Sequence, residues 1–217
     1  MQRLTESVYE LAPPGGVFNG TVIENLFPDK SAAARKLLVH RAVGKGEVLR
    51  LKPGLFCLAE PYRKTHLHPF ALAGMLHWPC HVSLESALAH HGLLPEAVFQ
   101  VASVTSKRTR SFKTPLGVFS YQLVPADFPR AGVESEKLDR ISWAFVASPL
   151  RAIADLIYLH RQVSWRKDGL NFLTESMRME PDELVQISFG QFEEIYKSIR
   201  NKRVKTYLEG MRREVGA

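Results

Sequence analysis

The sequence predicts an α+β protein built from two parts. Apolar residues recur at helical spacing near both ends of the chain, and β-branched or alternating runs occur around residues 47–58 and 99–124. The polar, proline-containing stretch 60–68 interrupts both patterns. We therefore expect an N-terminal domain over residues 1–60 and a larger mixed α/β domain over residues 69–217, with a small sheet and a helical C-terminus.

Composition and charge narrow the class of protein. The chain has 217 residues, 45% of them apolar, a formal net charge of +7 and only two cysteines, Cys57 and Cys80. Two cysteines provide neither a disulfide framework nor a paired metal knuckle, and the excess of cations favours a polyanionic partner. The N-terminus lacks the pattern of a signal peptide, and the longest apolar stretch, residues 70–76, is too short to cross a bilayer. We expect a cytoplasmic protein without a membrane partner.

Three helices are expected within the first 45 residues. The first covers residues 5–11 and ends at the Pro-Pro-Gly-Gly breaker 13–16. The second begins at Asn19 or at Thr21, which has capping-box spacing to Glu24. The third covers residues 30–43, with Asp29 placed to cap its N-terminus.

The helical wheel of the third helix suggests which face is buried. The face expected to turn inward carries Ala34, Leu37, Leu38 and the stem of Arg41. The opposite face, expected to turn outward, carries Ala32, Arg35, Lys36, Val39 and Val43, with His40 at its border. Two alternating runs, 47–51 and 55–58, follow and are joined by a Pro-Gly turn next to Lys52. This order of elements is typical of a winged helix-turn-helix.

Basic residues concentrate in this segment, where Glu47 is the single acidic residue between Lys30 and Lys52. In a helix-turn-helix the second helix enters the major groove of DNA, and a basic hairpin tip can contact phosphates. The alternative is an ordinary solvated corner of an α+β protein. The candidate DNA-binding residues are Lys30, Ser31, Arg35, Lys36, His40, Lys45, Arg50 and Lys52.

The second domain is expected to mix helices and strands. Helices are predicted over residues 70–78 and 84–91, the latter capped by Ser83, and strands over 99–105, 118–124 and 141–147. Further helices are predicted over 149–160, 168–177, 181–187 and 191–211. The segment between the first two strands offers a second basic surface made of Lys107, Arg108, Arg110 and Lys113. The basic C-terminus is most simply a solvated terminal helix.

The sequence holds no strong motif for catalysis, metal binding or phosphate binding. Histidines cluster between residues 66 and 91, but their spacing does not favour a metal site, and neither a phosphate-binding loop nor a nucleophile elbow occurs. Asp155, Glu85 and Lys107 could form a nuclease-like set across the fold, although an intrahelical pair between Asp155 and Arg151 is the simpler account. We expect no catalytic residue, no metal and no cofactor.

Four segments of the chain are distinctive: Gly-Leu-Phe-Cys-Leu at 54–58, Ser-Leu-Glu-Ser-Ala-Leu at 83–88 with His-Gly-Leu close behind, Gly-Val-Phe-Ser-Tyr at 117–121, and the helix 148–159. Together they resemble the AbiEi family, the antitoxins of bacterial type IV toxin–antitoxin systems. The resemblance covers most of residues 16–160. Many members have Tyr where this chain has Phe56.

The resemblance implies an antitoxin that binds double-stranded operator DNA, represses its own operon and counteracts a nucleotidyltransferase-like toxin, directly or indirectly. It is compatible with a monomer in solution that binds DNA cooperatively. Two other functions remain open on the residues alone. One is a stand-alone DNA-binding regulator with an effector-sensing second domain, and the other is an enzyme that processes nucleic acid.

Overall fold

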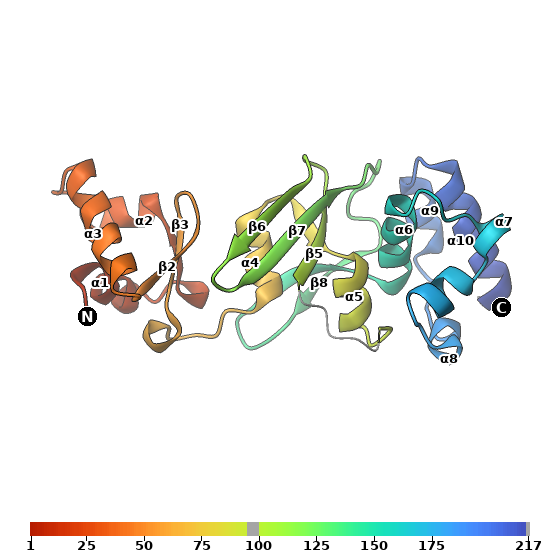
Figure 1. Ribbon diagram of the computed structural model, residues 1–217, viewed down its shortest axis with the longest axis horizontal. Coiled ribbons are helices and arrows are strands. Elements are labelled where there is room, and N and C mark those ends of the chain that lie inside the picture. The colour runs from red at the N-terminus through yellow and green to blue at the C-terminus, as the bar shows by residue number, and fades with distance from the viewer. Residues whose placement is uncertain (95–99, 216–217) are drawn as a thin grey trace.

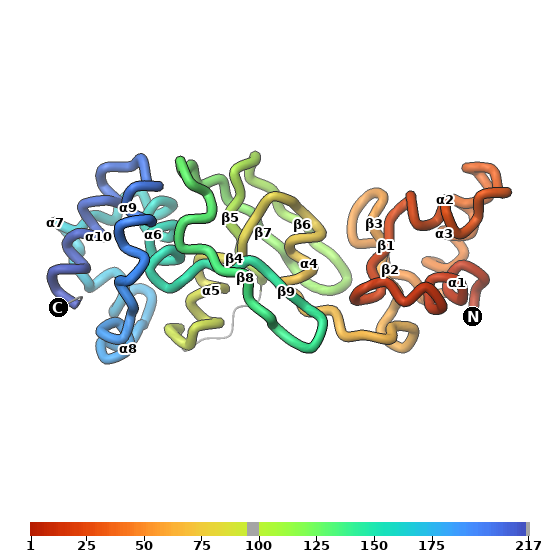
Figure 2. The backbone as a smooth tube through the Cα atoms, turned by 180° about the vertical axis from the view of Figure 1, so that it is seen from behind, coloured from red at the N-terminus to blue at the C-terminus, as the bar shows by residue number. Residues whose placement is uncertain are grey.

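The computed structural model describes residues 1–94 and 100–215 and has the expected mixed α+β composition. The molecule is elongated, with its termini at opposite ends (Figures 1 and 2). An N-terminal helix-and-strand region, here residues 1–58, lies at one end, a six-stranded sheet occupies the middle, and helices fill the other end (Figure 1).

The N-terminal region combines three helices with a three-stranded antiparallel sheet. Its strands lie in the order β1-β3-β2, so the first strand pairs with the last. The strand β1 was not predicted, because a strand of three residues gives no alternation to detect. The elements are α1 (Arg3–Leu11), β1 (Val17–Asn19), α2 (Gly20–Leu26), α3 (Ala32–Gly44), β2 (Val48–Lys52) and β3 (Leu55–Leu58).

The helix caps differ in part from those predicted. The side chain of Asn19 accepts a hydrogen bond from the Val22 amide, so the second helix begins there and the capping-box alternative does not apply. The prediction that Asp29 caps α3 is wrong. The hydroxyl of Ser31 accepts from the Ala34 amide at 3.2 Å, because the helix begins two residues later than expected.

The face of α3 that turns inward was also predicted wrongly. Val39 and Ala42 are buried, whereas Leu37 is 46% exposed and Arg41 is exposed. The apolar residues of α3 are spread around its axis, so the helix is not amphipathic and its sequence did not define a single buried face. Contacts with α1 and β2 decide the orientation instead.

The central sheet has six strands in the order β6-β7-β5-β4-β9-β8. The strands β5 and β7 are parallel, as are β4 and β9, and the other neighbours are antiparallel. Helix α4 lies against β4, β5 and β9, and α5 packs against β5 and α6. The elements are α4 (Pro69–Leu76), β4 (Cys80–Val82), α5 (Leu84–His90), β5 (Gln100–Thr105), β6 (Arg110–Thr114), β7 (Gly117–Leu123), β8 (Val133–Lys137) and β9 (Trp143–Ala147).

The sequence predicted half of these strands. β5, β7 and β9 are confirmed, although the first residue predicted for β5, Phe99, lies outside the described residues. β4, β6 and β8 were missed. β6 and β8 are edge strands rich in charged and polar residues, and β4 has three residues, so none shows the apolar pattern of a buried strand.

The C-terminal end is helical, as predicted, but it is more broken. The predicted helix 191–211 is two helices, because Ile199 is extended and pairs with Ala126. Asn201 then accepts hydrogen bonds from the amides of Arg203 and Val204 and starts the last helix. The elements are α6 (Pro149–Leu159), α7 (Trp165–Asp168), a π-helical turn (Phe172–Ser176), α8 (Pro181–Val185), α9 (Phe192–Ser198) and α10 (Lys202–Val215).

Buried apolar side chains form two clusters. One lies within the N-terminal region and joins α1, α2, α3 and the small sheet. The larger cluster runs through the central sheet and the C-terminal helices, and it includes Leu51 and Cys57 from the hairpin β2–β3. The hairpin thus contributes to both cores.

The domain boundary predicted between residues 60 and 69 stays a prediction.

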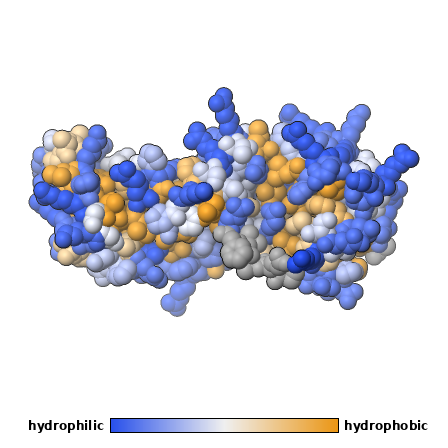
Figure 3. All heavy atoms as spheres, in the orientation of Figure 1, coloured by the Kyte–Doolittle hydropathy of each residue, from blue (hydrophilic) through white to orange (hydrophobic). Residues whose placement is uncertain are grey.

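On the face drawn in Figure 3, hydrophilic side chains project from much of the surface, with hydrophobic residues visible between them. Among the described residues, no helix combines the length and the apolar character needed to span a membrane.

The cap of α3 gives a stability test. Replacement of Ser31 by Ala removes the acceptor for the Ala34 amide and is expected to lower the free energy of unfolding by about 1 kcal/mol. The matched control is Asp29→Ala, which removes a side chain that caps nothing and is expected to change stability little. Urea unfolding followed by circular dichroism measures both. A larger loss for Asp29→Ala would contradict the assignment.

Candidate nucleic-acid interface

A groove of about 530 Å³ separates α3 from the hairpin β2–β3. Its floor is apolar, formed by Ile23, Val39 and Phe56, and cationic side chains stand along its sides. The guanidinium of Arg50 lies 5.8 Å from the centre of the Phe56 ring, which holds it beside the groove. The charged and polar residues that line the groove are Glu24, Arg35, Lys36, His40 and Arg50.

The predicted DNA-binding residues fall into two groups in the structure. Lys36, His40, Lys45 and Arg50 are exposed on α3, its C-terminal end and β2, and Lys30 is partly exposed just before α3. Ser31 is exposed at the start of α3, where it caps the helix. These residues can reach a ligand on the outside of the N-terminal region. Arg35 and Lys52, in contrast, are held by the protein itself.

Arg35 binds the turn between α2 and α3. Its guanidinium donates to the carbonyl of Lys30 at 2.8 Å and of Phe27 at 3.4 Å, and it pairs with Glu24 at 3.2 Å. Its side chain is only 19% exposed. Through these contacts Arg35 ties the end of α2 and the turn that follows it to α3.

Lys52 faces the central sheet. Its ammonium donates to the Leu76 carbonyl at the end of α4 and lies 5.8 Å from the centre of the Phe112 ring on β6. Burial, with a smaller effect from the nearby Arg110, lowers the pKa of Lys52. Lys52 ends β2 beside the hairpin turn, but its ammonium is directed to the central sheet, so it links the hairpin to that sheet and is not free for the phosphate contact that the sequence suggested.

The second predicted basic surface lies on the edge of the central sheet nearest the hairpin (Figure 1). Lys107, Arg108, Arg110 and Lys113 are all exposed in the β5–β6 turn and on β6. The ammonium of Lys107 donates to the Trp78 carbonyl at 2.8 Å, so Lys107 is anchored against the chain that follows α4.

A buried polar network lies deeper in the molecule, between β4 and α6. The Asp155 carboxylate pairs with Arg151 at 3.0 Å, accepts from the Ser83 hydroxyl at 2.8 Å and lies 3.3 Å from Nε2 of His81. Arg151 also donates to the Ala131 carbonyl at 2.7 Å. The predicted pair of Arg151 with Asp155 is confirmed. The prediction that Ser83 caps α5 is wrong, because its hydroxyl is used on Asp155.

Ionisation in this network is set by burial and by close partners. Burial would raise the pKa of Asp155, but the Arg151 guanidinium and the hydrogen bonds from His81 and Ser83 outweigh it and hold that pKa below its usual value. Burial lowers the pKa of His81 despite the nearby carboxylate, which favours a neutral imidazole. Among the described residues, neither Glu85 nor Lys107 is a partner of Asp155, so the nuclease-like set does not come together.

The clustered histidines have different hydrogen-bond partners. His68 accepts from the Phe70 amide at the start of α4, His90 pairs with Glu136, and His91 contacts the Ala147 carbonyl. Within residues 1–94 and 100–215, no group of three or more His, Cys, Asp or Glu residues could hold a metal ion.

Two outward residues of α3 were missed. Leu37 and Arg41 point to solvent beside Lys36 and His40. The sequence held no clear signal for them, because the apolar residues of α3 are spread around its axis.

The buried histidine predicts how stability depends on pH. Because the folded-state pKa of His81 lies below its ordinary value near 6.5, the unfolded chain binds the proton first as the pH falls. Stability is therefore expected to decrease from pH 6.5 towards pH 5. In His81→Gln this decrease is expected to be shallower by up to about 1.4 kcal/mol per pH unit, measured by urea unfolding at several pH values.

Ser83→Ala is the matched control, since it removes a partner of the same carboxylate without removing a group that titrates in this window. It is expected to lower stability at every pH and to keep the wild-type slope between pH 6.5 and 5. Parallel profiles for His81→Gln and the wild type would rule out a neutral buried imidazole.

No protein-family model matches the chain, and no curated protein matches it. The observations that bear on the role of the groove beside α3 are its geometry and the motifs in the sequence.

Proposed function

We propose that residues 1–58 form a winged helix-turn-helix that binds double-stranded DNA. The observation that carries this proposal is the order of elements, α1-β1-α2-α3-β2-β3, together with a sheet in which β1 pairs with β3 and β3 with β2. In such a module α3 enters the major groove and the hairpin β2–β3 is the wing. The exposed cations beside the groove between α3 and the hairpin support this reading.

The contacts can be assigned by exposure. Lys36 and His40 on α3 face the DNA, with Arg41 and Leu37 on the same exposed side. Lys30, Lys45 and Arg50 contact phosphates, since ammonium and guanidinium groups on the flanks of a recognition helix position the protein on the duplex. Ser31 caps the helix and aligns its N-terminal amides. Arg35 and Lys52 support the module from inside.

The role we propose for the whole chain is an antitoxin that represses its own operon. The motifs at 54–58, 83–88, 117–121 and 148–159, which resemble AbiEi antitoxins, support this role, and three of them lie in the central sheet region and its helices. The partners would be operator DNA and a nucleotidyltransferase-like toxin in the cytoplasm. No catalytic step is assigned to the buried Asp155.

DNA binding is tested by a salt series. The double variant Lys36→Ala with Arg50→Ala is expected to weaken binding to the protein's own upstream DNA. It is expected to make the slope of log affinity against log salt shallower by at least about 1, since Arg50 is the phosphate contact of the pair and each phosphate contact contributes roughly 0.9. The control, Lys202→Ala with Arg213→Ala, removes two exposed cations of α10 at the opposite end of the molecule and is expected to keep the slope. Equal slopes for both double variants would exclude this interface.

The antitoxin role is tested by co-expression. Expression of the chain together with the neighbouring nucleotidyltransferase-like gene is expected to restore growth that the toxin gene alone prevents. The variant Lys36→Ala with Arg50→Ala is expected to protect equally well from a foreign promoter while failing to repress a reporter under the native one. Failure of the wild-type chain to restore growth would exclude the antitoxin role and leave only the role of a DNA-binding regulator.

A further inference from the structure

We infer that the central sheet region carries a nucleotide-binding site, formed by two adjoining pockets around Trp78 and Phe145. The first pocket has a volume of about 380 Å³ and the second about 260 Å³, and both are lined by Trp78, Cys80, His81 and Phe145. The combined site is of the size that takes a small organic ligand.

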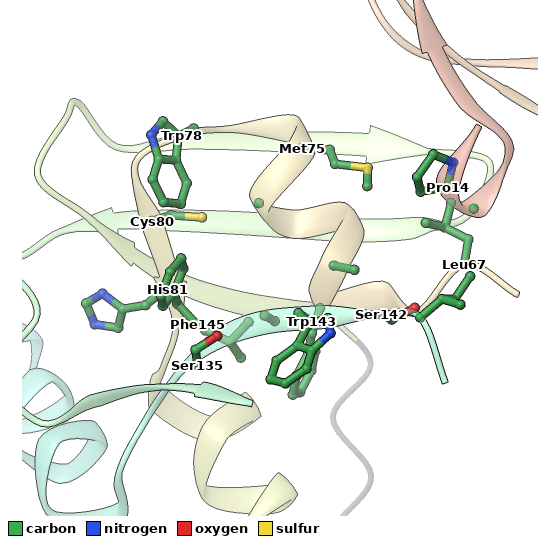
Figure 4. Close-up of a pocket in the computed structure, with 17 residues that line it drawn as sticks. Pro14, Leu67, Met75, Trp78, Cys80, His81, Ser135, Ser142, Trp143 and Phe145 are labelled. Atoms are coloured by element: carbon green, nitrogen blue, oxygen red, sulfur yellow. The ribbon is translucent and has the colours of Figure 1, made fainter. Parts of the chain in front are cut away.

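The first pocket is lined by flat and apolar side chains. Met75 and Trp78 come from α4 and the residues after it, while Trp143 and Phe145 come from β9 (Figure 4). Trp143 is 56% exposed and Trp78 52% exposed, which is unusual for side chains of this size. Two exposed indoles at the edge of a pocket provide stacking surfaces for an aromatic base. Ser135, Ser142 and His81 supply polar groups at its wall.

The second pocket is cationic. Arg130 lies with its guanidinium 3.9 Å from the centre of the Phe145 ring and 5.6 Å from that of Trp78, so it stands at the border of the two pockets. Arg151 lines the same pocket from α6. Its guanidinium donates through Nε to Asp155 and through Nη1 to the carbonyls of Pro129 and Ala131.

The neighbouring carboxylates are engaged elsewhere. Glu134 and Glu136 flank Ser135 on β8, and side chains alternate between the faces of a strand. Glu134 accepts from Gln191, and Glu136 pairs with His90. Asp139 accepts from the amides that lead into β9. The charge of Arg151 is already paired with Asp155, so the cation that an anion can reach at the border of the pockets is the exposed Arg130.

Stacking surfaces next to guanidinium groups match the two halves of a nucleotide. The base would lie between Trp78 and Trp143, and the phosphate would reach Arg130 at the border of the cationic pocket. The ligand is a free nucleotide or the exposed end of a single strand, since both present a base and a phosphate. Pro14 and Gly15 of the N-terminal region line the same pocket, with Pro14 at the end away from Trp78 (Figure 4).

Isothermal titration calorimetry of the full chain tests the site, with ATP, GTP, CTP and UTP in one set and a single-stranded RNA oligonucleotide in the other. Trp143→Leu is expected to weaken binding roughly 5- to 100-fold, the loss that follows removal of one stacking partner, and Trp143→Phe to retain most of it. Binding of a mononucleotide identifies a free nucleotide as the ligand. Binding of the oligonucleotide alone identifies a strand.

The phosphate half is tested separately. Arg130→Gln is expected to weaken the triphosphate or the oligonucleotide and to leave the uncharged nucleoside unchanged, whereas the control Arg166→Gln, at an exposed arginine of α7, is expected to change neither. No binding in either set at millimolar concentration, or equal binding by Trp143→Leu and the wild type, would overturn the inference. The titrations contain no duplex DNA, so their failure leaves the proposed function standing.

Discussion

The buried carboxylate of Asp155 is the constraint on which the central part of the molecule depends. An isolated charge at 2% exposure would be strongly unfavourable, so the carboxylate requires Arg151, Ser83 and His81 around it. These partners fix α6 against β4, and Arg151 extends the connection to the Ala131 carbonyl. The same contacts hold the start of α5, where Leu84 has a positive φ of 55° and a buried side chain. A fully satisfied polar network of this kind favours one arrangement of α6 against β4 over alternative arrangements.

A second constraint joins the N-terminal region to the sheet. Lys52 is tied to the end of α4 and to the Phe112 ring, and Leu51 and Cys57 lie in the larger core. The hairpin that we propose as a wing is therefore supported from behind by the central sheet. Its outer side, with Arg50 and the groove beside α3, stays open. The cations of this short segment thus divide into those that the protein itself binds and those that stay exposed.

The two proposals connect at this junction. The pocket between α4 and β9 is lined by Trp78 and Trp143, and by Pro14 and Gly15 from the N-terminal region. A ligand that filled the whole pocket would also contact the region that carries α3. A regulator that senses an effector, one of the alternatives that the residues left open, and an antitoxin that represses its own operon would both use such a connection. The two functions differ in what the second domain binds, which is a small effector in the regulator and a toxin in the antitoxin.

The sequence by itself determined the α+β class, the three N-terminal helices, the hairpin and the strands β5, β7 and β9, because helical spacing and β-branched runs are local signals. It also identified the pair of Arg151 with Asp155, which are four residues apart on one helix. Only the tertiary structure decided the buried face of α3, the partner of Ser83 and the separation of Arg35 and Lys52 from the exposed cations. Each of these depends on contacts between residues distant in the chain, and no local pattern records which neighbour a side chain will meet. The pocket around Trp78 and Trp143 has the same origin, since its residues meet only when β9 is laid beside β4.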